Sequence, residues 1–429
     1  MVPMPDAPNS PDVTRLVDHL FRRESGRLVA ILTRHFGVAH LHLAEDVVQD
    51  ALVKAMQTWP FTGVPQNPSA WLLQTAKNRA LDQTRRHSLW RGKQTELAPL
   101  VEDCLQSALT VPPPQLEDEI RDSQLRMMFV CCHPGLPVEA QVALTLKTLC
   151  GFGEREIAAA FLATPDAVTK RLVRARQYLR EQEVAVELPP AAALAPRVDT
   201  VLQALYLLFN EGYKASQGDS LMRIDLCAEA IRLAELLTAH PLGDRPATHA
   251  LLALMHFGAA RLSARTGDGG SILLLAEQDR SLWDQAQIQR GMMRLAASGT
   301  GMKVTRYHLE AGIAACHCLA RDFAATDWRQ IITLYDALLE QDGSPVVALN
   351  RAVAVAQVEG PRAGLAALDK IKDRKTLENY HPFHAVAGQL WLDAGDAAKA
   401  AAGFRRALEL AALPAERALL ETRLAQCAG

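Results

Sequence analysis

Apolar side chains recur every three to four residues along most of this chain, the spacing that places them on one face of an α-helix. Two such stripes follow one another before Trp59-Pro60. The first stripe contains Leu16, Leu20, Leu28, Ile31 and Leu32, and the second contains Ala44, Val47, Val48, Ala51, Leu52 and Ala55. Alternation of Val, Ile or Thr with polar residues is nearly absent, so strands have almost nowhere to form. The pattern predicts an all-α protein.

A third helix is expected after a turn at residues 63–68, because Asn67-Pro68-Ser69 is a typical helix start. Its inner side is expected to hold Trp71, Leu72, Ala76, Ala80 and Leu81. Its outward face is expected to carry Lys77, Asn78, Arg79, Asp82, Arg85 and Arg86. This face is dense in cations and hydrogen-bonding groups, which favours a bound polyanion. Asn78 and the two tryptophans Trp59 and Trp71 suit exposed bases, although core packing explains the tryptophans better.

A helix-turn-helix is predicted between residues 153 and 180. One helix contains Glu156 to Leu162, and Thr164 then provides an N-cap with Pro165 at the first helical position. Two helices joined by so short a turn are typical of DNA-binding proteins, with the second as the recognition helix. The polar residues near its start are Thr169, Lys170, Arg171, Arg174 and Arg176. We expect Lys170 and Arg171 to contact bases and the two later arginines to contact phosphates.

Two breaks in the helical pattern divide the chain into domains. An acidic and proline-containing segment includes Pro112-Pro113-Pro114 and is expected to be an extended spacer, and a Pro/Ala linker follows at residues 188–196. The predicted domains are residues 1–93, a linker at 94–117, residues 118–185, and residues 197–429. Residues 1–12 are expected to be a frayed tail.

The last predicted domain has a repeating helical pattern. Two turn glycines, Gly360 and Gly395, lie 35 residues apart, each between two apolar helical segments. This period is close to that of tetratricopeptide (TPR) helical hairpins, which stack into surfaces that bind other proteins.

The charge of the chain narrows the functional classes. The sequence contains 46 Lys+Arg against 48 Asp+Glu, a formal charge of −2, so positive charge must be concentrated locally if the protein binds a polyanion. The N-terminus has no signal-peptide pattern and no apolar run is long enough to span a membrane, so we expect a cytoplasmic protein. The eight cysteines show no ligand or disulfide spacing, which predicts reduced core thiols and no metal or cofactor.

Three of these motifs resemble a known family. The segments Ala44 to Ala51, Asn67 to Asp82 and Val168 to Arg176 are similar, in that order, to domains 2 and 4 of extracytoplasmic-function (ECF) sigma factors of the sigma-70 family. The remainder resembles the TPR-like extension of one ECF subgroup, through residues 205–213 and 344–354.

The resemblance implies a sigma domain 2 helical bundle, a sigma domain 4 helix-turn-helix and a TPR-like regulatory domain. It implies that the protein binds core RNA polymerase, through its β′ and β subunits, and promoter DNA, with no catalytic activity of its own. The implied polymerase-binding residues are Glu45, Asp46, Gln49 and Asp50. The residues implied for the unwound −10 element are Trp71, Lys77, Asn78, Arg79, Asp82, Arg85 and Arg86. Those implied for the −35 element are Thr169, Lys170, Arg171, Arg174 and Arg176.

Two other functions stay open from the sequence. A stand-alone helix-turn-helix regulator with a TPR-like sensor domain needs neither the 67–86 helix nor an acidic docking helix. An enzyme on a helical scaffold is disfavoured, because no nucleophile motif, phosphate-binding glycine loop or metal pair accompanies the histidines. The TPR-like part is expected to bind a protein partner and to control the promoter-binding domains.

Overall fold

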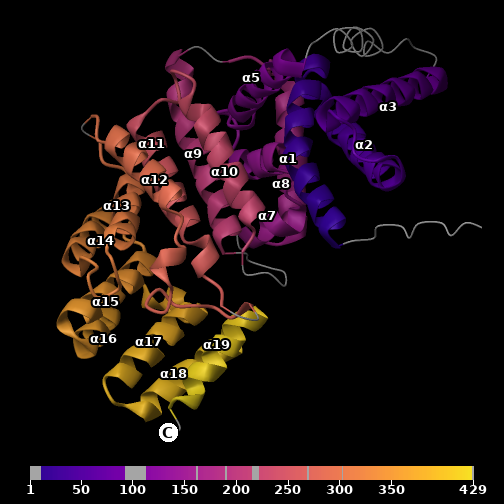
Figure 1. The fold of residues 1–429 in the computed structure, drawn as a ribbon. Helices are drawn as coiled ribbons and strands as arrows, with labels where there is room; N and C mark the ends of the chain where they lie inside the picture. The colour runs from indigo at the N-terminus through magenta and orange to yellow at the C-terminus, as the bar shows by residue number, and fades with distance from the viewer. Residues whose placement is uncertain are drawn as a thin grey trace, which may run out of the picture. The chain divides into compact units, whose positions relative to one another are not determined.

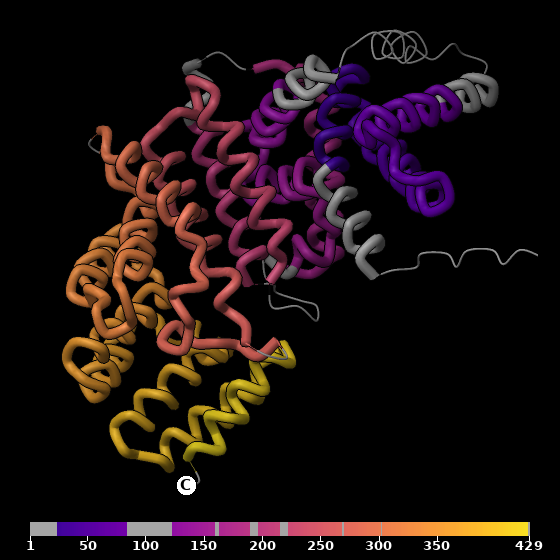
Figure 2. The backbone as a smooth tube through the Cα atoms, in the orientation of Figure 1, coloured from indigo at the N-terminus to yellow at the C-terminus, as the bar shows by residue number. Residues whose placement is uncertain are grey.

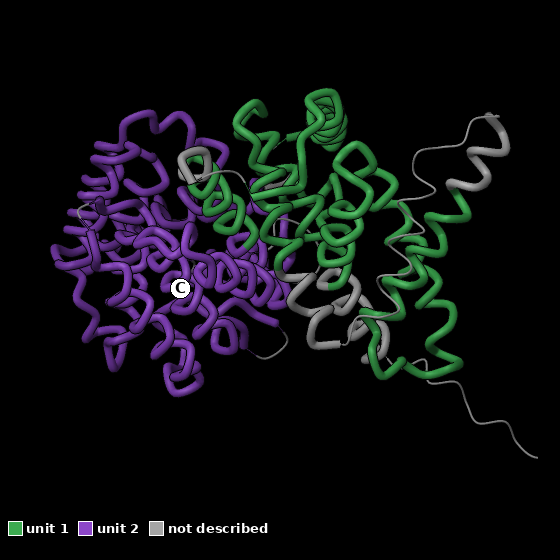
Figure 3. The backbone as a smooth tube through the Cα atoms, turned by 90° about the horizontal axis from the view of Figure 1, so that it is seen from above, with its two compact units in different colours: residues 1–208 green, residues 209–429 purple. Residues whose placement is uncertain are grey.

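A computed structural model of the protein describes residues 11–91, 113–160, 163–188, 191–214, 222–267, 270–301 and 303–427. In these ranges the chain forms eighteen α-helices and no strand, with one isolated antiparallel bridge between Thr266 and Ile272 (Figure 1). The prediction of an all-α protein is confirmed. The chain divides into two compact units, residues 1–208 and 209–429 (Figure 3). None of the described helices has the length and apolar character needed to cross a lipid bilayer.

The first unit begins with α1 (Pro11–Phe36), α2 (Leu41–Thr62) and α3 (Pro68–Arg91). The predicted apolar stripe of α2 is buried along its whole length, as the helical spacing required. α2 continues through Pro60 and ends at Thr62, where Gly63 adopts a positive φ of 80° that disfavours other residues. The turn predicted at residues 63–68 is confirmed.

The unit continues with α5 (Pro113–Cys131), α6 (Val138–Cys150), α7 (Glu154–Ala160), α8 (Pro165–Glu181) and α9 (Ala191–Tyr213). The predicted linker at 94–117 falls mostly on residues outside the described part, and α5 already begins at Pro113, since proline is tolerated in the first helical turn. The predicted linker at 188–196 is wrong from Ala191 onward, where α9 begins. Alanine has the highest helix propensity, and Pro196 is accommodated inside the helix.

The second unit is a succession of helices in which most chain neighbours pack against each other, as the tube in Figure 2 shows. Its helices are α10 (Ile224–Thr238), α11 (Pro246–Ala260), α12 (Gln285–Ser298), α13 (Arg306–Leu319), α14 (Trp328–Asp342), α15 (Pro345–Glu359), α16 (Pro361–Asp369), α17 (His381–Asp393), α18 (Ala397–Leu410) and α19 (Pro414–Ala425). The predicted hairpins are present: Gly360, with φ of 91°, joins α15 to α16, and Gly395, with φ of 84°, lies between α17 and α18.

Two ion-pair clusters hold distant parts of the second unit together. The Glu416 carboxylate on α19 lies 2.8 Å from the Lys214 ammonium and 3.3 Å from the His381 ring on α17. Arg423, also on α19, donates to Glu277 over 2.6 Å, across 146 residues of sequence. These ion pairs therefore help to hold the last helix, α19, against the rest of the unit. The apolar face of α19, which includes the buried Leu420, contributes as well.

Candidate nucleic-acid interface

The sequence starts α3 where it was predicted to. The Asn67 side chain accepts a hydrogen bond from the Ala70 backbone amide over 3.0 Å, and Pro68 occupies the first helical position. Such a cap satisfies an amide that the helix itself leaves unpaired. The cap fixes the direction of α3 and with it the direction of its polar face.

The exposed face of α3 contains Asn78, Arg79 and Asp82, as predicted. The Asn78 side-chain oxygen accepts a hydrogen bond from Gln74 one turn earlier, over 3.1 Å, which leaves its amide nitrogen directed away from that contact. Arg85 and Arg86 lie on the part of α3 whose side chains are outside the described residues. The described face thus combines one cation and one carboxylate with the amides of Asn78 and Gln83.

The placement of Lys77 on this face was wrong. Its side chain is only 1 % exposed. The reason is helical spacing: Lys77 lies four residues after Leu73 and three before Ala80, and both of these are buried. Lys77 therefore belongs to the packed stripe of α3.

The tryptophans of this region are core residues, as the sequence favoured. The rings of Trp59 and Trp71 meet edge to face with centroids 5.4 Å apart. Trp59 is buried at 4 % exposure and Trp71 is half-buried. An aromatic pair of this geometry contributes about 0.5–1.5 kcal/mol beyond its buried area. The pair joins the end of α2 to the start of α3 and so holds the intervening loop.

The recognition helix of the predicted helix-turn-helix is α8. Thr164 caps it by accepting a hydrogen bond from the Ala167 amide over 3.3 Å, and Pro165 is its first residue. Val168, Leu172, Ala175 and Leu179 form its buried stripe. α8 packs on both α7 and α6. The predicted arrangement and the predicted cap are confirmed.

The remaining faces of α8 differ in their surroundings. Thr169, Lys170 and Arg174 are exposed, and the Thr169 hydroxyl donates to the Pro165 carbonyl within its own helix. Arg171 is half-buried. Lys170, Arg171 and Arg174 line a hollow of about 610 Å³ between α8 and the start of α6. The hollow is open to solvent and is lined by these three cations and one carboxylate, Glu139, so its net positive charge suits an anionic group.

Arg176 lies on the opposite flank of α8 and contacts a different element. Its guanidinium donates to Glu45 on α2 over 2.8 Å. The structure thus brings together a residue expected to hold −35 phosphates and a residue expected to bind polymerase. The sequence offered no signal for this pairing, because 131 residues separate the two positions.

The outer face of α2 has a second component that the sequence analysis missed. Asp46, Gln49 and Asp50 are exposed, as expected of a docking helix. Beside them Val53 and Met56 are 46 % and 44 % exposed, which is high for apolar side chains within a helix. Both lie outside the buried stripe of α2. Their position in the helical repeat was the signal in the sequence that could have predicted their exposure. Together these residues form a mixed acidic and apolar surface, which is typical of a protein-binding site.

The buried thiols do not form a candidate metal centre. In the described ranges no group of three or more His, Cys, Asp or Glu side chains is placed to hold a metal ion. Cys131, Cys132 and Cys150 are buried and free, which agrees with the prediction of core thiols. Desolvation by burial raises the pKa of Cys132 to about 12, partly opposed by a hydrogen bond with Thr145 and by the Arg197 charge. A thiol with so high a pKa is a poor ligand and nucleophile.

Matches to protein families agree with this geometry. Residues 20–89 match the family described as Sigma-70 region 2, and residues 126–179 match the family described as Sigma-70, region 4. Residues 197–299 match a family of unknown function, DUF6596. An uncharacterized protein of Rhizobium meliloti (strain 1021) is 37 % identical over 398 residues, which cover 92 % of this chain and 91 % of that protein. No solved structure matches the chain.

The fold and its two polar helices define a promoter-recognition protein of helical domains. The chain belongs to the sigma-70 family, with the region 2 and region 4 domains typical of ECF sigma factors and a C-terminal helical extension. As a sigma factor it directs RNA polymerase to promoters and is not an enzyme. α3 lies within region 2 and α8 lies within region 4, each apart from its last two residues.

Proposed function

We propose that this ECF-type sigma factor docks on core RNA polymerase through α2, captures the unwound −10 element with α3 and reads the −35 element with α8. We further propose that its C-terminal helical unit modulates this activity. The observation that carries the proposal is the coexistence, on one chain, of an exposed recognition helix and an exposed polar face on α3. A stand-alone operator-binding protein needs only the recognition helix.

Docking on polymerase is supported by the surface of α2. Asp46 and Asp50 provide negative charge. The adjacent Val53 and Met56 provide apolar area that stays in contact with water until a partner covers it. Apolar area of this kind contributes about 25 cal/mol per Å² on burial. The acidic residues would set orientation and association rate. The proposed partner surface is therefore basic with an apolar centre.

Reading of the −35 element is supported by α8. Its first three turns expose Thr169, Lys170 and Arg174, and Arg171 lines the same hollow. A recognition helix typically contacts base edges through residues near its N-terminal end. The Thr164 cap and Pro165 fix the start of α8 and with it the direction of these side chains.

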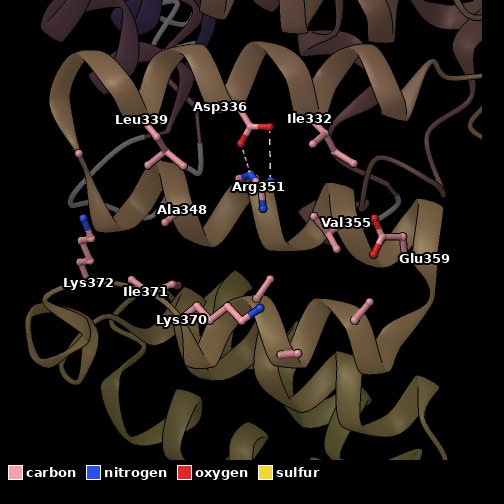
Figure 4. Close-up of a pocket in the computed structure, with 14 residues that line it drawn as sticks. Ile332, Asp336, Leu339, Ala348, Arg351, Val355, Glu359, Lys370, Ile371 and Lys372 are labelled. Atoms are coloured by element: carbon pink, nitrogen blue, oxygen red, sulfur yellow. Dashed lines mark hydrogen bonds and ion pairs between the residues drawn. The ribbon is translucent and has the colours of Figure 1, made fainter.

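The C-terminal unit offers a groove for a protein partner (Figure 4). α14, α15 and α16 line a hollow of about 560 Å³, and its lining includes Ala348 of α15 and three alanines of α16. The Arg351 guanidinium on α15 is paired with the Asp336 carboxylate on α14. Lys370 and Lys372 lie in the same lining and are exposed, as is one carboxylate, Glu359, so the unpaired charge of the groove is positive overall. We propose that a partner segment with acidic side chains binds here.

The role of this groove can be tested by charge reversal. Lys370→Glu combined with Lys372→Glu should change sigma-dependent reporter expression in cells, where the partner is present. The same variant should transcribe normally in vitro with purified core polymerase. Lys375→Glu, an exposed lysine that is not part of the groove lining, is the matched control. Unaltered reporter expression would remove the groove from the proposal.

The modulating role of the whole unit can be tested by truncation, and the structure decides where to cut. α9 spans both units, and Arg197 in its first half donates to the Phe129 carbonyl of α5 over 3.0 Å. A stop after Pro190 removes that contact, whereas a stop after Lys214 keeps it. The chain ending at Lys214 should bind core polymerase but differ from the full chain in transcription from the same promoter. Equal transcription by both forms would dismiss modulation by the C-terminal unit.

A further inference from the structure

Two cationic side chains lie over one buried tryptophan in the second unit. Trp283 follows the short helix η4 (Arg280–Leu282), is 3 % exposed, and belongs to an apolar core that includes residues of α11, α12 and α13. The guanidinium carbons of Arg261 and Arg280 lie 5.3 Å and 4.7 Å from the centre of its ring. An indole ring attracts cations to its face. Trp283 therefore gathers both arginines at one place in the fold.

These two arginines do not form ion pairs with carboxylates in the described part of the chain. Arg280 donates to the carbonyls of His317 and Ala320 at the end of α13, and Arg261 donates to the Gln278 amide oxygen over 3.4 Å. The carboxylates nearby in sequence or in space are exposed and contact other groups: Asp279 and Asp284 cap η4 and α12, Glu277 pairs with Arg423, and Asp322 pairs with Arg321. The cluster therefore holds two positive charges without paired counter-charges.

Three nitrogen atoms of the same cluster are buried, and no protein atom in the described ranges pairs with them. They are Nε of Arg261, Nε1 of Trp283 and Nδ1 of His317. The first two can only donate a hydrogen bond. Buried donors of this kind are normally satisfied by a protein atom, an ordered water or a ligand. The cluster therefore has spare hydrogen-bond donors as well as unpaired positive charge.

The titration of the neighbouring groups agrees with an excess of positive charge. Desolvation by burial, together with the charges of Arg261 and Arg280, lowers the pKa of His317 from 6.5 to about 4, so its ring is neutral near pH 7. The Cys318 thiol does not supply a compensating negative charge, because burial raises its pKa to about 11. An anion among these side chains would offset the repulsion between the arginines and favour protonation of His317.

We propose that the cluster of Arg261, Arg280, Trp283 and His317 binds a phosphoryl group. Phosphate supplies three strong acceptor oxygens and more than one negative charge, which suits several donors on separate elements and two cations. A carboxylate has only two oxygens. Both arginines are half-buried, so solvent reaches the cluster beside them.

This site would give the second unit a ligand. It includes the first residue after α11, the segment at η4 and the end of α13, so a bound phosphoryl group would fasten these three parts of the chain together. The binding itself goes beyond the proposed function. Only the use of that ligand to modulate transcription rests on the proposed function.

Thermal unfolding of the full chain in increasing inorganic phosphate tests the site, because a ligand that binds the folded state raises the unfolding temperature. Chloride at equal ionic strength is the reference. Arg261→Gln is compared with the wild type and with Arg405→Gln, which removes the same charge from an exposed position on α18. Loss of packing in Arg261→Gln would lower the unfolding temperature at every phosphate concentration, so the test is the change that phosphate causes within each protein.

We expect phosphate at a hundred times its dissociation constant to raise the unfolding temperature of the wild type and of Arg405→Gln by about 5–10 °C. The rise should be less than about 2 °C in Arg261→Gln, since its site lacks one of the two cations. Equal rises in all three proteins would indicate a general salt effect and an adventitious ion only. That result, or no rise in the wild type, would overturn the site.

His317 provides a second readout that a purely structural role of the cluster would not change. NMR of histidine-labelled protein, with His317→Gln to assign the signal, should show a higher pKa of His317 in phosphate than in chloride. An unchanged pKa would contradict the site.

The source of the phosphoryl group is distinguished by repeating the titration with glycerol phosphate. Stabilisation at lower concentrations of this ester than of inorganic phosphate would assign the group to a larger molecule, and the reverse would assign it to free phosphate. None of these measurements uses polymerase or promoter DNA. Their failure would therefore remove the phosphoryl site and leave the proposed function standing.

Discussion

Arg176 on the recognition helix donates a hydrogen bond to Glu45 on α2 over 2.8 Å, and both side chains are largely shielded from water. Removing one partner leaves a shielded charge without its counter-charge. Glu45→Gln and Arg176→Met are each expected to lower the free energy of unfolding by about 1–3 kcal/mol. The double variant is expected to lose less than the sum of the two. Urea unfolding followed by circular dichroism measures the coupling, and additivity within about 0.5 kcal/mol would show that the pair contributes no interaction energy.

Lys77 and Arg79 are neighbours on α3 with opposite environments, which predicts different effects of substitution. Arg79 is exposed, so Arg79→Ala should weaken binding of the holoenzyme to a −10 single strand and reduce the salt slope by about 0.7. Lys77 is 1 % exposed, so Lys77→Met should alter the stability of the chain and leave the salt slope unchanged. Salt titrations of oligonucleotide binding separate the two. A smaller slope for Lys77→Met would return Lys77 to the DNA-binding face.

Arg171 lines the basic hollow beside α8 and is the proposed base-reading residue. Arg171→Ala should relax discrimination at one position of the −35 element by about 1–3 kcal/mol, the value of one bidentate contact to guanine. Arg180→Ala, in the exposed last turn of α8, is the control and should leave base preference unchanged. Binding to a set of single-base −35 variants measures both. An unaltered preference in Arg171→Ala would assign Arg171 to phosphate contacts.

The carboxyl group of Glu416 predicts a pH dependence of the second unit. Desolvation raises its pKa, but hydrogen bonds and charges from His381 and Lys214 outweigh that effect and lower the pKa from 4.5 to about 2. A carboxyl group whose folded pKa is depressed stabilises the fold above its unfolded pKa, and the stabilisation is lost as pH falls through the folded pKa. The contribution of Glu416 should therefore be complete above about pH 4.5 and disappear toward pH 2.

Glu416→Gln isolates this contribution. At pH 7 the variant should unfold at a lower temperature than the wild type, with a loss of about 1–3 kcal/mol. The difference between the two proteins should shrink as pH is lowered from 4.5 toward 2. Glu421→Gln, an exposed position on the same helix, serves as the control. A difference between wild type and Glu416→Gln that stays constant over this range would contradict the ion-pair account.

The sequence predicted those parts of the fold that local periodicity and capping determine. The buried stripe of α2, the Thr164 cap of α8 and the glycine turns at Gly360 and Gly395 all follow from neighbouring residues, and all are present. Lys77 was predicted to be exposed because lysine is a charged residue, although its position in the helical repeat belongs to the buried stripe. Residues 191–196 were assigned to a linker from their proline and alanine content, whereas the alanines favour the helix that begins at Ala191.

The part of the candidate site that the sequence did not predict depends on tertiary contacts. The contacts of Glu45 with Thr148 and Arg176 join positions more than 100 residues apart, and no local pattern encodes such a pairing. The sequence analysis made no assignment for Val53 and Met56, although their helical position directs them outward. Whether a neighbouring helix covers such a side chain is decided by the tertiary arrangement.

The central claim is that this chain directs core RNA polymerase to promoters, and transcription in vitro tests it most directly. The purified chain would be added to bacterial core RNA polymerase on a pool of promoter fragments. The account predicts initiation that depends on the chain, from fragments that share one −35 and one −10 element. Binding to duplex DNA without core polymerase, together with no initiation in its presence, would contradict the account and identify an operator-binding regulator instead.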